Sequence, residues 1–522
     1  MDGFGVATAA EGNAIVAANP RNFGYLVNHF LATTLQASGP AVGLPWGERG
    51  NSEVGHLNLG AGRIVSQDLP RISHAIATGE FAKNPALLAA IAHAEKNNSR
   101  LHLAGLVSPG GVHSSEEHLY SLLGLCADRK FKEVYVHVFT DGRDTEQKAA
   151  LPSIDRLERK FIQLRTGKIA SVGGRFYAMD RGLHWELTES AYRAMTLGEG
   201  PQASSAREAV QQNYERQVYD ETIPPTVIAE NGKPVGTIQD GDAVIFFNFR
   251  HDRQVQLVRS FSDPAFDKFR APRAYLQNMY YVTMTLYDKN LSAAAAFPPM
   301  EIKMGLSEVI SKNGMNQFHI AESEKYAHVT SFWNGGRQEP FPLEEREIVT
   351  SPAAYQKRYE DVPEMSVKKI GDAVITKLQG GTRFILANVA NPDMVGHTGN
   401  FKACKAAIEA VDEQVGRIFE EAAAARACLV ISADHGNIEQ TFDQRTGKID
   451  KEHTLNPVPF VVAGPGLARK KILQRGYEEL PGIVPEGVLA DAAPTVLMLL
   501  GLPVPPEMTG VPLLPLLLKQ TE

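Results

Sequence analysis

The feature that most restricts the fold of this chain is the repeated alternation of short apolar runs with longer stretches of helical pattern. Runs rich in aliphatic and aromatic residues, typical of strands buried on both faces, are LHLAGLV (101–107), VYVHVF (134–139), AVIFFNF (243–249), RFILANV (383–389) and CLVIS (428–432). Between the last two runs, residues 402–427 place apolar side chains at helical spacing, as a crossover between parallel strands requires. The alternation predicts an α/β fold.

The length of the chain, 522 residues, exceeds what a single hydrophobic core supports, so we expect two domains. The clearest linker is SAAAAFPPME (292–301), where small residues and paired prolines interrupt the pattern. Candidate metal ligands lie near both ends of the chain, whereas basic motifs lie between them. This placement predicts an insertion, with residues 67–299 forming the inserted domain and residues 1–66 and 300–522 forming the other.

Charge and cysteine content exclude several classes of protein. The formal net charge of −7 provides no excess of basic residues for nucleic acid or for an anionic membrane. Cys126, Cys404 and Cys428 form no CxxC pair, so neither a disulfide framework nor a thiolate metal site is expected. Since no basic segment with a following apolar run opens the chain and no stretch reaches bilayer length, we expect a cytoplasmic protein.

Acidic and imidazole side chains follow two of the predicted strands and precede the apolar stretch PVPFVV. They are Asp393 and His397, Asp434 and His435, and His453. The ends of strands in α/β sheets are common ligand sites, and imidazole with carboxylate ligands favours Mn²⁺ or Zn²⁺ over Ca²⁺. Each Asp-His pair alone is more often a turn with a capping aspartate, but their joint placement indicates a metal site.

Ser52 lies in GERGNSEVGHLNLGAG, at the predicted opening of a helix. In one interpretation it is a helix N-cap. In the other it is a nucleophile, because a helix N-terminus favours phosphate and a neighbouring metal lowers the pKa of a hydroxyl. The residues alone leave both interpretations open.

Motifs in consistent order resemble those of the cofactor-independent phosphoglycerate mutases: GNSEVGHLNLGAGRIV, GGVHS, FTDGRD, GRFYAMDR, FNFRHDR, AESEKYAHVT, NPDMVGHTG, ADHGN and HTLNPVPF. The similarity runs from Asp2 to LADAAPTVLMLLGL near residue 500. It implies an alkaline-phosphatase-like, doubly wound domain with two divalent metals, usually Mn²⁺ with Zn²⁺ or Co²⁺ as alternatives, and an inserted domain that binds substrate. The implied activity interconverts 3-phosphoglycerate and 2-phosphoglycerate in glycolysis and gluconeogenesis without 2,3-bisphosphoglycerate.

The resemblance gives each candidate residue a role. It implies one set of metal ligands, Asp393, His397 and His453, and a second set, Asp2, Ser52, Asp434 and His435. Ser52 matches the serine that is transiently phosphorylated. The matched substrate-binding residues are His113, Arg143, Asp144, Arg175, Arg181, Arg250 and Arg253, together with Lys325 near the metals.

The substrate class explains this basic set. A phosphoglycerate carries a dianionic phosphate and a carboxylate, which suit several bidentate guanidinium contacts. Taken singly, each arginine is more often a solvated surface charge. Asp144 matches the family's acid and base, although its ordinary interpretation is a turn aspartate paired with Arg143. Lys325 is expected to neutralise the transferring phosphoryl oxygens.

Two other interpretations remain open. The ligand set also suits a phosphatase, a phosphonate hydrolase or a different phosphomutase, because metal ligands alone do not choose a substrate. The second is a catalytically inactive metal-binding or scaffold protein, because the resembling proteins have an apolar strand before the Asp-Gly motif, whereas this chain begins at Met1. We expect either a longer natural product or a sheet without that interior strand and an Asp2 without its anchor.

Three residues depart from the family pattern. Pro109 stands where the family commonly has Asp, and Trp46 and Arg49 differ from the usual residues of their loop. The sequence assigns them no role. The resemblance further implies a monomer that acts on a small molecule.

Overall fold

Each apolar run predicted to be a strand forms one. These strands are β2 (Leu101–Leu106), β3 (Val134–Thr140), β8 (Ala243–Phe246), β13 (Phe384–Ala387) and β14 (Leu429–Ser432). The helix expected between the last two is α15 (Phe401–Ala424), capped by Asn400, whose side chain accepts from the backbone N–H of Ala403. The computed structural model describes residues 1–8, 11–270, 275–352, 358–443 and 445–521.

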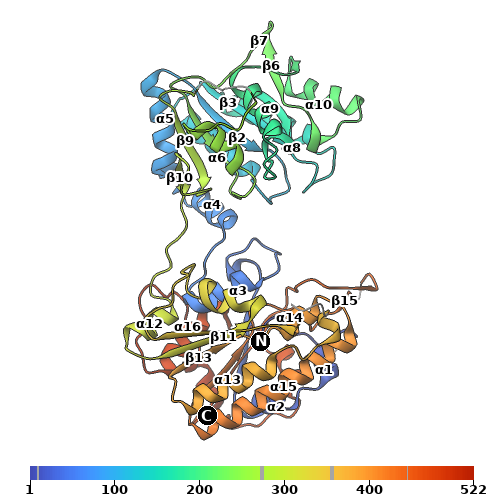
Figure 1. Cartoon of the computed structure of the whole chain (residues 1–522), viewed down its shortest axis with the longest axis vertical. Helices are drawn as coiled ribbons and strands as arrows, with labels where there is room; N and C mark the ends of the chain where they lie inside the picture. The colour runs from blue at the N-terminus through green and yellow to red at the C-terminus, as the bar shows by residue number, and fades with distance from the viewer. Residues whose placement is uncertain (9–10, 271–274, 353–357, 444, 522) are drawn as a thin grey trace. The chain divides into compact units, whose positions relative to one another are not determined.

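The chain divides into two compact units, each with its own hydrophobic core (Figure 1). Unit 1 comprises Met1–Gln67 and Glu301–Glu522, and unit 2 comprises Asp68–Met300. Unit 2 is therefore inserted into unit 1, and both units mix helices with strands. The predicted α/β fold class, with a second α/β domain inserted into the first, is confirmed.

The expected linker at 292–301 is only partly one. Its alanine-rich half forms β10 (Ala294–Phe297), which pairs in parallel with β9 (Tyr280–Thr285) at the edge of a sheet. An edge strand needs only one neighbour, and Phe297 stacks on Phe81 with ring centroids 6.0 Å apart. A segment whose composition suggested a linker thus extends the sheet by one edge strand.

Unit 1 contains two main sheets, with strand orders β14-β17-β1-β18 and β12-β11-β13. β17 runs antiparallel to β1 and β14, while the remaining pairs in these sheets are parallel. A small hairpin, β15 with β16, lies apart from them. Strand bounds are β1 (Leu31–Gln36), β11 (Gln317–Glu322), β12 (Glu344–Val349), β15 (Phe442–Asp443), β16 (Lys448–Ile449), β17 (Val458–Ala463) and β18 (Gly487–Val488).

The expectation that the strands flanking α15 belong to one parallel sheet is wrong. Among the described residues β13 pairs only with β11 and β14 only with β17, so each is an edge strand of its own sheet. The first residues of the chain reach both edges: Met1 N donates to Ser432 O at 2.7 Å, and Asp2 N donates to Val389 O at 3.0 Å. Asp2 is therefore anchored by backbone hydrogen bonds, and it is buried.

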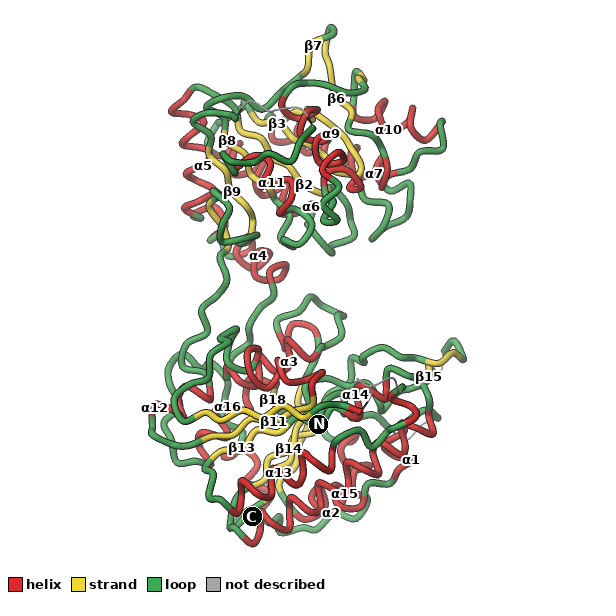
Figure 2. The backbone as a smooth tube through the Cα atoms, in the orientation of Figure 1, coloured by secondary structure: helices red, strands yellow, loops and turns green. Residues whose placement is uncertain are grey.

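Helices cover both faces of the unit 1 sheets (Figure 2). Helix α15 packs against α1, α2, α13 and α14, whereas α3, α12 and α16 contact one another elsewhere in the unit. Helix bounds are α1 (Ala14–Ala18), α2 (Arg21–His29), α3 (Ser52–Ala61), α12 (Leu306–Lys312), α13 (Val367–Gln379), α14 (Asn391–Gly396), α16 (Ala492–Leu499) and α17 (Leu514–Leu517). In the described part of the chain, no helix combines the length and apolar character needed to cross a bilayer.

Unit 2 is built on one sheet of order β10-β9-β8-β2-β3-β4-β6-β5, with β7 added beside β6. Alternate residues of β8 enter different cores: Ala243 and Ile245 pack on one face, Val244 and Phe246 on the other. Remaining bounds are β4 (Lys168–Gly174), β5 (Gln202–Ala203), β6 (Thr226–Glu230), β7 (Lys233–Pro234), α4 (Asp68–Ala77), α5 (Pro85–Asn97), α6 (Glu116–Asp128), α7 (Ala150–Leu164), α8 (Arg175–Ala178), α9 (Trp185–Thr196), α10 (Ala206–Glu215) and α11 (Val255–Ser262).

A buried polar chain crosses the middle of this sheet. Ser171 Oγ donates to His137 Nδ1 at 2.8 Å, His137 Nε2 donates to His102 Nδ1 at 3.0 Å, and His102 Nε2 donates to Asp242 Oδ2 at 3.1 Å. The carboxylate can only accept, which fixes the direction of every bond in the chain. Burial lowers the pKa of His102, and burial together with neighbouring His102 lowers the pKa of His137 well below its ordinary value.

These hydrogen-bonded histidines predict that the folded protein loses stability in acid. The unfolded histidines bind protons below about pH 6.5, whereas the folded rings resist protonation, so the free energy of unfolding falls as the pH drops below about 6.5. The loss reaches about 1.4 kcal/mol per pH unit for each histidine. Denaturant unfolding between pH 7.5 and 4.5 measures it. His137→Asn should reduce the slope, and the exposed-site control His74→Asn should not; equal slopes in all three proteins would contradict this account.

Candidate functional site

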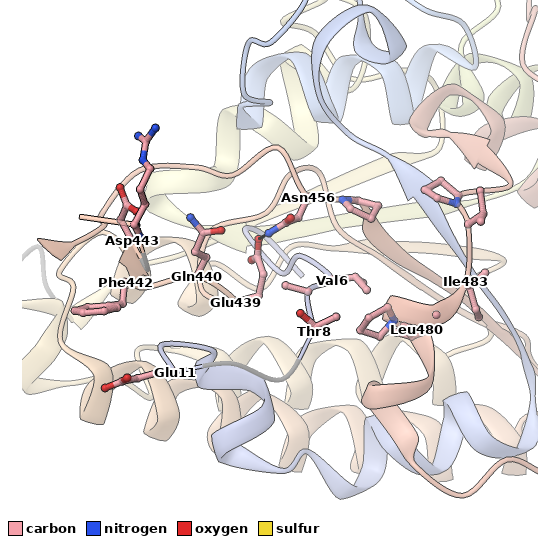
Figure 3. A pocket seen from close by; sticks show the side chains of 17 residues that line it. Val6, Thr8, Glu11, Glu439, Gln440, Phe442, Asp443, Asn456, Leu480 and Ile483 are labelled. Carbon is pink, nitrogen blue, oxygen red and sulfur yellow. Dashed lines mark hydrogen bonds between the residues drawn. The ribbon is translucent and has the colours of Figure 1, made fainter. Parts of the chain in front are cut away.

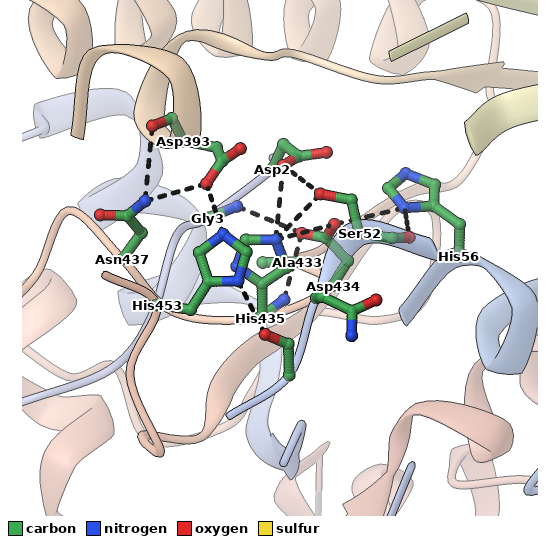
Figure 4. Close-up of polar contacts among 12 residues, drawn as sticks. Asp2, Gly3, Ser52, His56, Asp393, Ala433, Asp434, His435, Asn437 and His453 are labelled. Carbon is green, nitrogen blue, oxygen red and sulfur yellow. Dashed lines mark hydrogen bonds and ion pairs between the residues drawn. The ribbon is translucent and has the colours of Figure 1, made fainter. Parts of the chain in front are cut away.

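The candidate ligands from separate motifs lie together beside the ends of the unit 1 strands (Figure 4). Asp393, on α14, follows β13, and Asp434 follows β14 directly. His453 precedes β17, and because β17 is antiparallel to β14, its amino end meets the carboxyl end of β14. Asp2 reaches the same place through the backbone contacts of the first residues.

Asp393, His397 and His453 form the first cluster. Asp393 Oδ1 lies 3.2 Å from His397 Nε2 and 3.2 Å from His453 Nε2. The two Nε2 atoms are themselves 3.2 Å apart. Three potential ligand atoms therefore converge, as binding of one cation requires.

Asp2, Ser52, Asp434 and His435 form the second cluster. Ser52 Oγ lies 3.2 Å from Asp2 Oδ1 and 3.0 Å from His435 Nε2. His435 Nε2 lies 3.4 Å from Asp434 Oδ2. Asp393 also belongs to a group with Asp2 and His435, so the two clusters adjoin.

Ser52 is not the N-cap of its helix, which corrects one of the two interpretations of this residue. The N-cap is Asn51, whose side chain accepts the backbone N–H of Val54 at 3.0 Å. Because Asn51 satisfies the helix end, the hydroxyl of Ser52 is left to face Asp2 and His435. Ser52 is the first residue of α3, a position where the helix dipole favours negative charge.

The tautomers of the three histidines are fixed by backbone carbonyls. Nδ1 of His397 donates to Lys451 O at 2.6 Å, and Nδ1 of His453 donates to Gly50 O at 2.7 Å. Nδ1 of His435 lies 3.3 Å from Gly436 O. In its neutral form each ring therefore has the lone pair of Nε2 free for a cation, an arrangement common among metal-ligating histidines.

The cluster carries an excess of negative charge. Asp2, Asp393 and Asp434 are buried beside the ammonium of Lys325, whose Nζ lies 2.6 Å from both Asp2 Oδ1 and Asp393 Oδ2. Burial opposes ionisation, yet hydrogen bonds and charge from neighbouring histidines hold the pKa of Asp393 and Asp434 well below the usual range. Burial and then the charge of Asp434 raise the pKa of Asp2.

The donor set matches divalent cations. Imidazole nitrogens with free lone pairs and carboxylate oxygens, without thiolates, suit Mn²⁺, Zn²⁺ or Co²⁺. Two positive charges at each of two positions would also offset the buried carboxylates. Lys325 Nζ lies 2.6 Å from Ser52 Oγ as well, so the nucleophile candidate sits beside a fixed cation.

Sequence reasoning missed His56 and Asn388. His56 Nδ1 donates to Ser52 O at 2.8 Å and lies 3.2 Å from Asp434 Oδ2. Asn388 Nδ2 donates to Asp2 Oδ2 at 2.8 Å and to His56 Nε2 at 2.9 Å. His56 is four residues after Ser52 on α3, so the two side chains share a helix face, and this spacing could have indicated that His56 lies at the site.

Unit 2 brings together the predicted acidic and basic residues after β3 and β4. Arg175 Nη1 lies 2.7 Å from Asp141 Oδ1 and 2.5 Å from Asp144 Oδ2, and Arg175 Nη2 donates to His113 Nε2 at 2.8 Å. Burial and then the charge of Arg175 lower the pKa of His113 to about 4, so the ring is neutral near pH 7. The ordinary interpretation of Asp144 paired it with Arg143, but Arg143 pairs with Glu221 at 3.2 Å.

A second part of this basic set surrounds Asp252. Arg181 Nη1 lies 2.7 Å from Asp252 Oδ2, and Arg250 Nε lies 3.0 Å from Asp252 Oδ1. Arg253 makes no hydrogen bond or ion pair within the described ranges of the chain. Burial and then three neighbouring guanidinium groups lower the pKa of Arg253. Few negative charges nearby therefore balance the charge of this guanidinium.

Asp141 and Asp252 were also missed. Asp141 receives the backbone N–H groups of Arg143 and Asp144 at 3.2 and 3.0 Å and the hydroxyl of Ser108 at 2.7 Å. It therefore shapes the FTDGRD turn that presents Asp144. Both aspartates lie inside basic motifs, and that proximity in sequence was the available signal.

Comparisons with known proteins agree on one family. A family profile described as "BPG-independent PGAM N-terminus" matches residues 72–289. The 2,3-bisphosphoglycerate-independent phosphoglycerate mutase of Moorella thermoacetica is 47% identical over 98% of this chain and 96% of its own length. A second such mutase, from Methanosarcina acetivorans, is 48% identical over 98% of this chain and 95% of its own.

A solved structure is similar over nearly the whole chain. Leishmania mexicana phosphoglycerate mutase, studied at low cobalt concentration, is 32% identical with a TM-score of 0.58, covering 98% of this chain and 96% of its own. The fold likeness therefore extends to both units.

Proposed function

The chain belongs to the 2,3-bisphosphoglycerate-independent phosphoglycerate mutase family, which makes it an isomerase, and from this premise we propose its mechanism. It interconverts 3-phosphoglycerate and 2-phosphoglycerate through a phosphoserine intermediate on Ser52 at a two-metal site. The observation that carries the proposal is the position of Ser52 Oγ, within 3.2 Å of Asp2, His435 and Lys325. A hydroxyl so surrounded by carboxylate, imidazole and ammonium suits a nucleophile better than a helix cap.

Asp393, His397 and His453 would hold one divalent cation, and Asp2, Ser52, Asp434 and His435 the other. Bound there, the cations supply Lewis-acid charge that favours the deprotonated Ser52 hydroxyl and neutralises phosphoryl oxygens. We propose Mn²⁺, with Zn²⁺ or Co²⁺ as alternatives, because the ligands combine imidazole with carboxylate. Lys325 adds a fixed positive charge at the same oxygens.

Transfer proceeds in two balanced halves. Deprotonated Ser52 Oγ attacks phosphorus in line, the bond from phosphorus to the glycerate oxygen breaks, and protonated Asp144 gives its proton to that oxygen. After glycerate turns, Asp144 removes the proton of the other hydroxyl, whose oxygen attacks phosphoserine and frees Ser52. The phosphoryl group returns to the same glycerate, so no bisphosphate is consumed.

His113, Arg143, Arg175, Arg181, Arg250 and Arg253 are proposed to bind the anionic substrate. Arg253 supports this role most directly, because its neighbours raise the local positive potential. Asp141 holds Arg175 and the turn that carries Asp144.

We also propose a cellular compartment and an oligomeric state for the protein. Cys126, Cys404 and Cys428 are free thiols, which supports a reducing compartment, and we propose the cytoplasm. We further propose a monomer whose partner is its small-molecule substrate.

Replacing Ser52 tests the nucleophile. Ser52→Ala should lower kcat for conversion of 3-phosphoglycerate by at least about 10⁴-fold, because no side chain remains to accept the phosphoryl group. Ser38→Ala is the matched control, since Ser38 Oγ only donates to Leu455 O at 3.1 Å, and it should keep full activity. Substantial turnover by a correctly folded S52A protein would exclude Ser52, and rapid phosphate release without isomerisation by the wild type would favour a phosphatase.

Replacing Arg253 tests the substrate-binding set. Arg253→Ala should raise KM for 3-phosphoglycerate by more than about tenfold, because a weakly compensated cation near the substrate anion is lost. Arg259→Ala, which removes an exposed guanidinium paired with Asp263 at 3.3 Å, is the control and should leave KM unchanged. Steady-state kinetics measure both. Equal KM values for R253A and wild type would remove Arg253 from the substrate site.

A further inference from the structure

A buried carboxylate outside both clusters connects the segments that carry them. Glu439 is 2% exposed, and its Oε2 accepts the backbone N–H of Gly5 at 3.1 Å and of Asn437 at 2.8 Å. Its Oε1 accepts the hydroxyl of Thr454 and Nδ2 of Asn456, the latter at 2.9 Å. Four neutral donors from three segments therefore meet at one side chain.

Each of these segments carries a proposed ligand. Gly5 lies three residues after Asp2, Asn437 two residues after His435, and Thr454 directly after His453. Glu439 can approach the backbone of residue 5 this closely because glycine has no side chain. A Cβ on Gly5 would overlap the carboxylate of Glu439. Glycine at this position thus allows the carboxylate to reach the backbone.

Packing alone does not restrain these segments. Residues of all three, including Val6, Gln440 and Asn456, line a cavity of about 720 Å³ together with Glu439 (Figure 3). A segment that borders a cavity gains fewer packing contacts on that side than one inside a core. Hydrogen bonds to Glu439 therefore add to the restraint that the backbone bonds Val6 N to Pro457 O, Ile438 N to Gly3 O and Thr454 N to Gly436 O provide.

We propose that Glu439 is a positioning residue that fixes the spacing between the two metal clusters by holding the Asp2, His435 and His453 segments together. The inference rests on the proposed function in treating those three residues as metal ligands. Residues behind the ligands orient them, and their loss commonly weakens metal binding or activity by about 10- to 100-fold. Glu439 acts through its four donors and touches neither substrate nor ligand side chain.

Glu439→Gln is the direct test. The backbone N–H groups of Gly5 and Asn437 can only donate, so the amide oxygen stays with them. The NH₂ group then faces Thr454 and Asn456, so the two hydrogen bonds that the carboxylate accepts from the His453 segment are lost or must reverse, and the restraint on that segment weakens. Calorimetric titration with Mn²⁺, without substrate, should show at least tenfold weaker binding at one of two sites.

Asp412→Asn is the matched control. Asp412 is likewise a buried carboxylate held by neutral donors, the backbone N–H groups of Asn22 at 3.0 Å and Phe23 at 2.8 Å, but it joins α15 to α2. It should lower the melting temperature and leave Mn²⁺ affinity unchanged. Equal weakening of Mn²⁺ binding in D412N and E439Q would overturn the proposal, since general destabilisation would then explain both.

Glu439→Asp separates position from charge. It keeps the carboxylate but shortens the side chain, so it cannot reach all four donors, and Mn²⁺ binding should again weaken at least tenfold. Wild-type affinity in either Glu439 variant would overturn this inference alone. A wild-type protein that binds no Mn²⁺ would overturn the proposed function and this inference with it, whereas a wild-type protein that binds Mn²⁺ without mutase activity leaves the positioning test decisive.

Discussion

Three carboxylates, buried together in the two adjoining clusters, are the constraint on which the rest of unit 1 depends. Asp2, Asp393 and Asp434 repel one another, and each buried charge costs several kcal/mol unless it is compensated. Lys325 supplies one positive charge, and the neighbouring histidines, in their protonated form, supply part of the remainder. The surplus negative charge is what gives the cluster its affinity for divalent cations, so an unfavourable arrangement for folding becomes the basis of the proposed chemistry.

Holding this arrangement requires restraint beyond the pairing of β14 with β17. β13 and β14 belong to separate sheets, and the ligands follow them on loops and short helical turns. Hydrogen bonds made by Asn388 and Glu439 tie these segments to the first residues of the chain. Neutral donors around these buried polar side chains thus help to position the candidate ligands.

Sequence patterns predicted the strands, the inserted arrangement of the fold class and the segments that converge, because apolar runs and strand ends have strong local signatures. They could not show that Asn51 caps α3, since Asn and Ser suit that position equally. The strand at 294–297 pairs with β9 and packs on Phe81, contacts that an alanine-rich segment does not reveal. Asp141 and Glu439 escaped notice for the same reason: a carboxylate that accepts backbone N–H groups has no signature until those groups are placed.

The central claim is that Ser52 carries the phosphoryl group during turnover. Rapid acid quenching of the Mn²⁺-loaded protein with 3-phosphoglycerate, followed by mass spectrometry of the peptide containing residues 50–63, tests it directly. The account predicts phosphate on Ser52 within the first turnover and none on that peptide in the absence of substrate. Turnover with an unmodified Ser52, or with phosphate on another side chain, would contradict it.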